Sequence, residues 1–312
     1  MKMIKDIPDG LDFIMLANRY LNLGWRSAFS ILEDGDIANE TEDAETIMGY
    51  WSAAEPELAT ALALVQQAAE FYLKARIASV SPWLLVRTEP KDFPKPKLGE
   101  AASFSEFRTL DAQDLIRVSN AVFDEILSEE FTREFDAKRA QRNAGTHSVG
   151  GKPTTALEII RYALIISEPF IGERKWAQSR RDHLTRDRLY QTSFEWQVFT
   201  MAKEFERLTR DLTAGELKRF YGFEKKQRVY RCLNCHYETR DAAEDGWLTA
   251  QLIPNAPDST NIHCYACGED SEVIRKSCRQ APECKGNVIS KEHQVCLTCL
   301  EDWVPEEDEN SS

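Results

Sequence analysis

Apolar residues recur at spacings of three and four over the first two thirds of the chain, which predicts amphipathic helices. Residues 11–33 carry this pattern without an internal proline, and the acidic stretch after them predicts the end of that helix. A second helix should end at Ser81 and Pro82, because proline cannot continue the helical hydrogen-bond ladder. Its apolar stripe consists of Leu58, Leu62, Val65, Ala69 and Leu73.

A third apolar stripe begins after Asp111 and predicts one long helix that ends at residues 142–147. The stripe consists of Leu115, Val118, Val122, Ile126, Phe131 and Phe135. A short polar loop containing Gly150 and Gly151 should follow. Thr155 and Glu158 have the spacing of an N-terminal capping box, and the helix that they open is apolar nearly all round, so we expect it to be buried.

The pattern of residues 173–212 predicts further helix. Its first part is basic, and its second part carries a narrow apolar stripe, here called the seam, whose residues recur at steps of four and three. The seam consists of Tyr190, Phe194, Val198, Met201, Phe205, Leu208 and Leu212. Such a seam is more often packed within one chain than between two. Residues 89–105 hold three prolines among lysines and predict a surface loop.

Composition restricts the class of protein. With 312 residues, 42% apolar and 29% charged, the chain has the composition of a soluble globular protein of two or three domains. It lacks the roughly 20 uninterrupted apolar residues of a membrane span, and its first residues lack the apolar core of a signal peptide, so we expect a cytoplasmic protein. The net charge is −13, yet residues 131–231 carry 21 basic against 13 acidic residues, which favours contact with a polyanion there.

All 8 cysteines lie between residues 232 and 299, and they come in pairs. Three pairs have the two-residue gap that directs two thiolates at one tetrahedral ion. Two sequential four-cysteine zinc sites are the simplest assignment, and an interleaved one, joining the first pair to the third, stays open. The ligands are Cys232, Cys235, Cys264 and Cys267, followed by Cys278, Cys284, Cys296 and Cys299.

Other roles for these thiols are less favoured. Disulfides do not suit a cytosolic chain, and four pairs exceed what one redox reaction needs. With eight thiols present, His236 and His263 are expected to be bystanders, and four ligands per ion indicate structural zinc. We expect a zinc-ribbon-like module over residues 230–304 and a disordered acidic tail over 305–312. Its aromatic residues should pack in the core, although a protein or base-stacking contact is conceivable: Tyr230, Tyr237, Trp247 and Tyr265.

Arg142, Asn143 and His147 form the candidate catalytic motif. A guanidinium is a permanently charged fork suited to phosphate, and imidazole exchanges protons near neutral pH. Arg231 and His236 have the same spacing, but they flank the cysteine pair Cys232 and Cys235. We therefore expect this second segment to form part of a metal-binding turn.

The chain resembles the HEPN superfamily. In both, an arginine with a polar neighbour lies near the end of a long helix, and a histidine follows before the next helix, here Arg142, Asn143 and His147. The resemblance covers about residues 10–170 and implies a mainly α fold: a HEPN-like bundle over 1–172, a basic helical extension or linker over 173–229, and then the cysteine module. It further implies a metal-independent endoribonuclease that acts on RNA as a homodimer, with two motifs forming one composite site. A role as a toxin or antiviral defence effector would follow from the same resemblance.

The alternative is a non-catalytic adaptor. In that case the helical half dimerises or binds a nucleotide, Arg142 pairs with an acidic neighbour, and the zinc module recognises a protein or nucleic acid. A protein partner of the zinc module fits either hypothesis.

Overall fold

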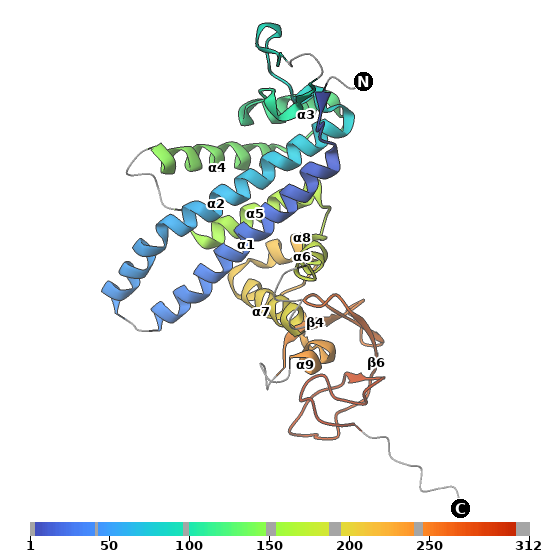
Figure 1. The fold of residues 1–312 in the computed structure, drawn as a ribbon. Helices are drawn as coiled ribbons and strands as arrows, with labels where there is room; N and C mark the ends of the chain where they lie inside the picture. The colour runs from blue at the N-terminus through green and yellow to red at the C-terminus, as the bar shows by residue number, and fades with distance from the viewer. Residues whose placement is uncertain are drawn as a thin grey trace, which may run out of the picture. The chain divides into compact units, whose positions relative to one another are not determined.

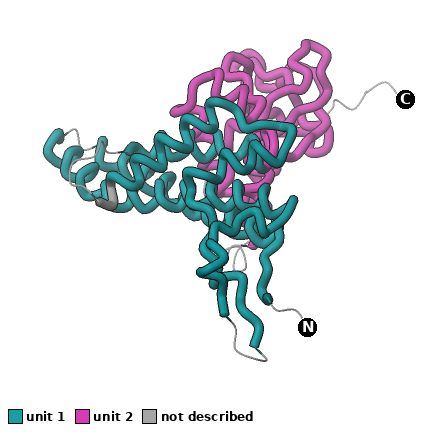
Figure 2. The backbone as a smooth tube through the Cα atoms, turned by 90° about the horizontal axis from the view of Figure 1, so that it is seen from above, with its two compact units in different colours: residues 1–170 teal, residues 171–312 magenta. Residues whose placement is uncertain are grey.

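The computed structural model describes residues 4–40, 43–95, 100–147, 154–186, 195–239 and 246–303. The chain divides into two compact units, residues 1–170 and 171–312, which Figure 2 shows in different colours. The first unit is helical, and the second combines helices with a cysteine-rich region. Among the described helices, none is both long and apolar enough to cross a bilayer.

Two long antiparallel helices, α1 (Gly10–Asn39) and α2 (Ala44–Val80), form the frame of unit 1. Asp9 caps α1 in a reciprocal capping box with Asp12, so that two otherwise unpaired backbone donors are satisfied. The helices approach closely at Gly24, where a Cβ atom would lie 2.5 Å from Val65 Cγ2 and 3.0 Å from the Ala61 carbonyl oxygen. The predicted end of α2 at Ser81 is confirmed.

The predicted end of α1 near residue 33 is wrong, because the helix continues through the acidic stretch to Asn39. Contacts with α2 explain the extension. The Tyr50 hydroxyl donates to the Ile31 carbonyl at 2.6 Å, and Gly35 packs against the Trp51 ring. Local polarity therefore predicted a helix end that tertiary packing overrides.

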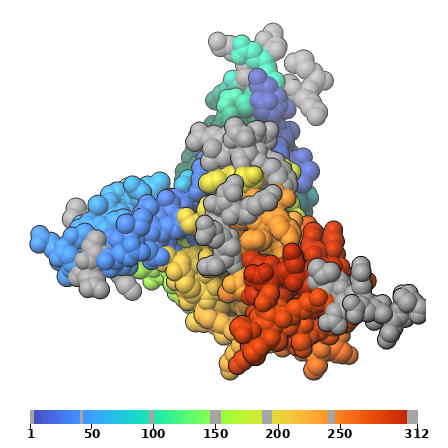
Figure 3. All heavy atoms as spheres, turned by 90° about the horizontal axis from the view of Figure 1, so that it is seen from below, coloured from blue at the N-terminus to red at the C-terminus, as the bar shows by residue number. Residues whose placement is uncertain are grey.

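The α1–α2 hairpin has an extreme charge composition. Residues 27–73 contain ten Asp and Glu residues and no Lys, Arg or His. Most of the acidic side chains lie near the tip, between Glu33 and Glu57. Figure 3 shows the hairpin as a narrow blue arm, which is therefore an anionic surface.

The third apolar stripe forms two helices, α3 (Ala112–Val122) and α4 (Glu129–His147), and the prediction of one long helix is wrong. Two local hydrogen bonds stabilise the break. The Asn120 side chain accepts one from the Leu127 amide at 3.0 Å, and the Ser128 hydroxyl accepts one from the Phe131 amide at 3.1 Å. Ile126 lies in the break and is exposed, whereas Phe131 and Phe135 are buried.

Helix α5 (Ala156–Phe170) packs against α1, α2 and α4 in unit 1, as Figure 1 shows. The predicted capping box is confirmed: the Thr155 amide donates to Glu158 at 3.3 Å and the Glu158 amide to the Thr155 hydroxyl at 3.2 Å. Most of its apolar side chains are buried, as expected from the sequence. Short pieces complete the unit: β1 (Ile4–Lys5), β2 (Ala102–Ser103), and 3-10 turns at Pro82–Leu85, Pro90–Asp92 and Phe104–Glu106.

Unit 2 begins with α6 (Trp176–Leu184), α7 (Glu195–Asp211) and α8 (Ala214–Tyr221). The segment predicted as an extension or linker thus belongs to the same compact unit as the cysteines. Arg180 and Glu204 form a buried ion pair at 2.6 Å between α6 and α7. The seam residues from Val198 to Leu212 are buried, and its first two members, Tyr190 and Phe194, lie outside the described residues.

The rest of unit 2 is a five-stranded antiparallel sheet in chain order with the short helix α9 (Leu233–Glu238). The strands are β3 (Tyr230–Arg231), β4 (Leu248–Leu252), β5 (Asn261–Cys264), β6 (Asp270–Ile274) and β7 (Ile289–Ser290). The sheet closes on itself through Leu297, whose amide donates to the Val288 carbonyl and whose carbonyl accepts from the Arg231 amide, both at 3.0 Å. The result is a small ring of strands.

Candidate metal centres and the Arg142 cluster

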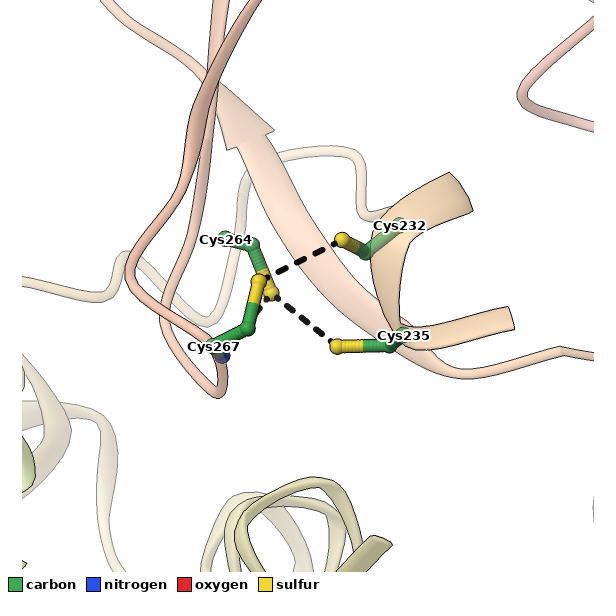
Figure 4. Close-up of side chains that lie close together, drawn as sticks. All are labelled: Cys232, Cys235, Cys264 and Cys267. Atoms are coloured by element: carbon green, nitrogen blue, oxygen red, sulfur yellow. Dashed lines mark hydrogen bonds between the residues drawn. The ribbon is translucent and has the colours of Figure 1, made fainter. Parts of the chain in front are cut away.

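The first cysteine cluster is built from two knuckles of unit 2. Cys232 and Cys235 lie at the start of α9, while Cys264 ends β5 and Cys267 lies in the turn before β6. Figure 4 shows the four side chains pointing toward one another from these two sides. The Sγ atoms of Cys232 and Cys267 lie 3.7 Å apart, as do those of Cys235 and Cys264.

These distances fit a tetrahedral metal ion. Metal–sulfur bonds of about 2.3 Å at tetrahedral angles place the sulfur atoms about 3.8 Å apart. A disulfide would require about 2.05 Å, and all eight cysteines are free thiols. The cluster therefore has the geometry of a closed four-thiolate site with no position left for a substrate.

The second cluster brings together Cys278, Cys284, Cys296 and Cys299, with Sγ atoms 3.6 Å and 4.0 Å apart. The cysteines group sequentially and not in the interleaved arrangement, since each cluster contains two consecutive pairs along the chain. Three of the four thiols are buried, and Ile289 and Trp303 pack beside them.

Backbone amides and one hydroxyl surround the sulfur atoms. The Cys267 amide donates to Cys264 Sγ at 3.4 Å, the Gly286 amide to Cys284 Sγ at 3.3 Å, and Thr249 Oγ1 lies 3.1 Å from Cys264 Sγ. Such donors stabilise thiolates and fix their orientation.

Crowding controls the protonation of these thiols. Hydrogen bonding with Cys232, and then with Cys264 and Cys267, raises the pKa of Cys235 far above its usual value, and burial raises it further. Burial, followed by the neighbouring cysteines, raises the pKa of Cys299 to about 12. A cysteine binds a metal ion as the thiolate, so metal binding should release the protons that these thiols hold.

Arg181 of α6 lies beside the first cluster. Its Nη1 donates to the Ala266 carbonyl at 2.9 Å, and its guanidinium rests on Gly268, where any Cβ atom would lie 2.4 Å from Nη2. Burial lowers the Arg181 pKa, while Cys267 and Cys264 act in the opposite direction. The side chain thus places positive charge next to two of the four thiols.

Neither histidine beside the cysteines belongs to a cluster. His263 Nδ1 pairs with Asp270 at 2.7 Å. His236 Nδ1 is buried and has no hydrogen-bond partner among the described atoms.

The Arg142 cluster lies in unit 1, near the end of α4. Arg142 Nη1 donates to Glu70 Oε1 of α2 at 2.8 Å, and its Nε and Nη2 atoms lie 3.3 Å and 3.2 Å from Asn143 Oδ1. The Arg142 side chain is 23% exposed and that of Glu70 is 11% exposed. The guanidinium is therefore held at a half-buried position with one edge on a carboxylate.

His147 is the last residue of α4, and its side chain lies outside the described residues. The backbone of residues 142–147 is helical throughout, and the helix ends at His147, within the range predicted from the sequence. Five positions along an α-helix place the two Cα atoms about 140° apart around the axis. Within one chain, Arg142 and His147 therefore do not share a helix face.

Glu70 is the residue of this cluster that sequence reasoning missed. It is the one charged residue between positions 58 and 73, in a stretch that is otherwise apolar or weakly polar. One turn before it, Gln66 accepts a hydrogen bond of 2.6 Å from the buried Tyr162 hydroxyl of α5. A lone acid in a buried helix was the available signal, because such a group requires a partner.

No protein-family model matches the chain, and neither does any curated protein or solved structure. The HEPN resemblance inferred from the sequence therefore stays a prediction. The cysteine clusters stand on geometry alone.

Proposed function

We propose that unit 1 is a metal-independent endoribonuclease of HEPN type and that unit 2 is a module built on two structural zinc ions. The observation that carries the proposal is the Arg142 guanidinium, held by Glu70 near the end of α4 beside an exposed Asn143. A guanidinium fixed in advance costs little further ordering when it binds a phosphate.

In this reaction His147 takes the proton from a ribose 2′-hydroxyl, whose oxygen attacks the adjacent phosphorus. Arg142 stabilises the charge on the phosphorane, and Asn143 orients the phosphate or the imidazole. The 5′-oxygen leaves with a proton, so the products are a 2′,3′-cyclic phosphate and a 5′-hydroxyl. Acid–base help contributes about 10²–10⁴ in rate, and charge stabilisation adds a similar factor.

A homodimer completes the site. Because Arg142 and His147 lie about 140° apart on α4, an arginine of one copy and a histidine of the other are better placed to act together. Helix α1 offers surface for such an association, since Leu11, Met15 and Leu23 are exposed. A toxin or antiviral effector that cleaves cellular RNA is the biological role that agrees with this chemistry.

Zinc is the ion that suits unit 2. Four thiolates in a closed tetrahedral set are typical of structural zinc, which supplies folding energy rather than catalysis. The Sγ distances of 3.6 to 4.0 Å support this choice. The role of unit 2 would then be recognition or sensing.

A non-catalytic adaptor is the second candidate, and the Arg142–Glu70 ion pair favours it. An arginine that is paired with a carboxylate has a structural role without any substrate. Under this hypothesis the helical unit dimerises or binds a nucleotide.

Incubation with labelled RNA in magnesium-free buffer separates the two candidates. The wild type should yield 2′,3′-cyclic phosphate ends in the presence of EDTA, with the zinc content measured before and after. Arg142→Ala and His147→Ala should each lower the rate by at least about 100-fold. Arg139→Ala on the same helix is the matched control. RNA left intact by the wild type, or equal loss in the control, would favour the adaptor.

A further inference from the structure

The ring of strands in unit 2 borders a cavity of about 790 Å³, here called the ring cavity. Every strand contributes to its lining, for example through Ala250 of β4 and Ile262 of β5, and Leu297 contributes at the closure. Helix α9 forms another wall. A cavity of this size accommodates a ligand of several residues and is far larger than one side chain needs.

The floor of the ring cavity is apolar. Leu233, Ile262, Val273 and Leu297 line it and are each at most 7% exposed. Such a floor accepts aliphatic groups, including the stems of lysine and arginine side chains.

The rim of the ring cavity is acidic. Five carboxylates line it, against two permanently charged cations, Arg231 and Lys291. The carboxylates belong to Glu238, Glu269, Asp270, Glu272 and Glu292. Lys291 already pairs with Glu272, whereas no salt bridge to Glu238 or Glu269 exists among the described residues.

A smaller cavity of about 200 Å³ adjoins the first, because it shares Asn234, Glu238 and Glu269 with it. The two carboxylates without a salt bridge thus border both spaces.

An aromatic pair stands at the same rim. Tyr237 of α9 was expected in the core but is 41% exposed, whereas Tyr230, Trp247 and Tyr265 are buried as expected. The Tyr237 ring lies 5.2 Å from that of His293. In the sequence, Tyr237 follows Cys235 of the first cluster and His293 precedes Cys296 of the second. Exposed tyrosine with carboxylates is suited to cationic side chains.

We propose that the ring cavity binds a basic peptide segment of a partner protein. The apolar floor takes the aliphatic parts, and Glu238 and Glu269 take the ammonium or guanidinium groups. Nucleic acid is disfavoured, because the rim would repel phosphates. The inference depends on unit 2 holding its metal ions, and it is independent of RNA cleavage by unit 1.

Panning a random peptide library on the immobilised full-length, zinc-loaded protein tests this proposal. Selected peptides should be enriched in lysine and arginine beside apolar residues. The strongest of them, labelled and measured by fluorescence anisotropy, should bind Glu238→Lys/Glu269→Lys about tenfold more weakly than wild type. Tyr237→Ala should also weaken binding.

The matched control is Glu45→Lys/Glu55→Lys, which changes the net charge equally at exposed positions of α2. Its binding should equal that of wild type, and zinc content and melting temperature verify that each variant is folded. Selected peptides without excess basic residues, equal loss in both double variants, or capture of single-stranded RNA that depends on Tyr237 would overturn the proposal. Loss of RNA cleavage in the Arg142→Ala variant, with peptide binding intact, would leave it standing.

Discussion

At the scale of single residues, charge placed in half-buried positions determines the properties of both units. Glu70 and Arg142 satisfy each other at 2.8 Å in unit 1, and Arg181 approaches two thiols in unit 2. In each case one side chain links distant parts of the sequence. Replacing it should therefore change the stability of unit 1 or the metal affinity of unit 2 more than replacing an exposed residue would.

Replacing Glu70 should destabilise unit 1. Glu70→Ala leaves the Arg142 guanidinium without its carboxylate partner, and the expected loss is about 1–3 kcal/mol in the free energy of unfolding. Denaturant titration followed by circular dichroism measures it. Glu57→Ala, at an exposed position on the same helix, should change the free energy by less than about 0.5 kcal/mol, and an equal loss would contradict the prediction.

Replacing Arg181 should weaken the first metal centre selectively. Arg181→Gln removes the positive charge beside Cys264 and Cys267, and a loss of about tenfold or more in metal affinity is expected. Cobalt titration, with its thiolate charge-transfer bands, gives the affinities of the two centres. Because Arg181 lies at the first cluster, the affinity of the second should stay unchanged, and a uniform loss would argue against a local effect.

At the scale of elements, the long helices are arranged by close contacts as much as by their own periodicity. Gly24 permits the approach of α1 to α2, whereas Gly49 of α2 would have nothing within 4 Å of an added Cβ atom. Of these two glycines, Gly24 has no room for a side chain, whereas Gly49 has open space beside it.

The two glycines should respond in opposite directions to alanine. Gly24→Ala meets the Ala61 backbone and should destabilise unit 1 by about 1–3 kcal/mol. Gly49→Ala should stabilise it by about 0.5–1 kcal/mol, because alanine loses less backbone entropy in a helix. Thermal unfolding of both variants provides the comparison, and a shift of the same sign in both would contradict the packing argument.

Sequence reasoning succeeded where the signal was local. Two cysteines with two residues between them lie on one tight turn, so this spacing was enough to predict both clusters. The pair Thr155 and Glu158 was enough to predict a helix start. It failed where distant residues decide the outcome. The end of α1 depends on Tyr50 and Trp51 of α2, and the partner of Arg142 lies 72 positions away. The catalytic assignment of Arg142, Asn143 and His147 stays a prediction.

At the scale of the whole molecule, the two units should respond differently to solution conditions. Unit 1 depends on apolar packing between helices, whereas the cysteine region has a small core and two four-cysteine clusters that could each hold a metal ion. Metal removal should therefore act on the cysteine region and not on unit 1.

Removal of metal should unfold the cysteine region and spare unit 1. Metal binding supplies much of the folding energy of small four-cysteine modules, and β6 and β7 join the two centres in one sheet. A strong chelator should make residues 230–303 sensitive to protease while residues 1–170 stay protected, as mass spectrometry of the fragments would show. Simultaneous digestion of both parts would contradict this expectation.

High pH should act on unit 1 through Tyr162. Burial, then the charge of Glu70, raises the Tyr162 pKa well above the usual tyrosine value of 10.0. The unfolded chain ionises near pH 10 and the folded one above it, so this stabilising contribution is complete below pH 10 and is lost as pH rises beyond it. Unfolding free energies from about pH 9 to about pH 11 should fall less steeply for Tyr162→Phe than for wild type.

The hairpin of α1 and α2 has a further effect on how any polyanion reaches the molecule. Residues 27–73 contribute ten acidic side chains and no basic ones, and the field of an exposed charge extends about 8 Å at physiological ionic strength. A nucleic-acid strand would therefore meet increasing electrostatic repulsion toward the turn between α1 and α2. If unit 1 binds RNA as proposed, we expect the strand to bind away from the turn between residues 40 and 43.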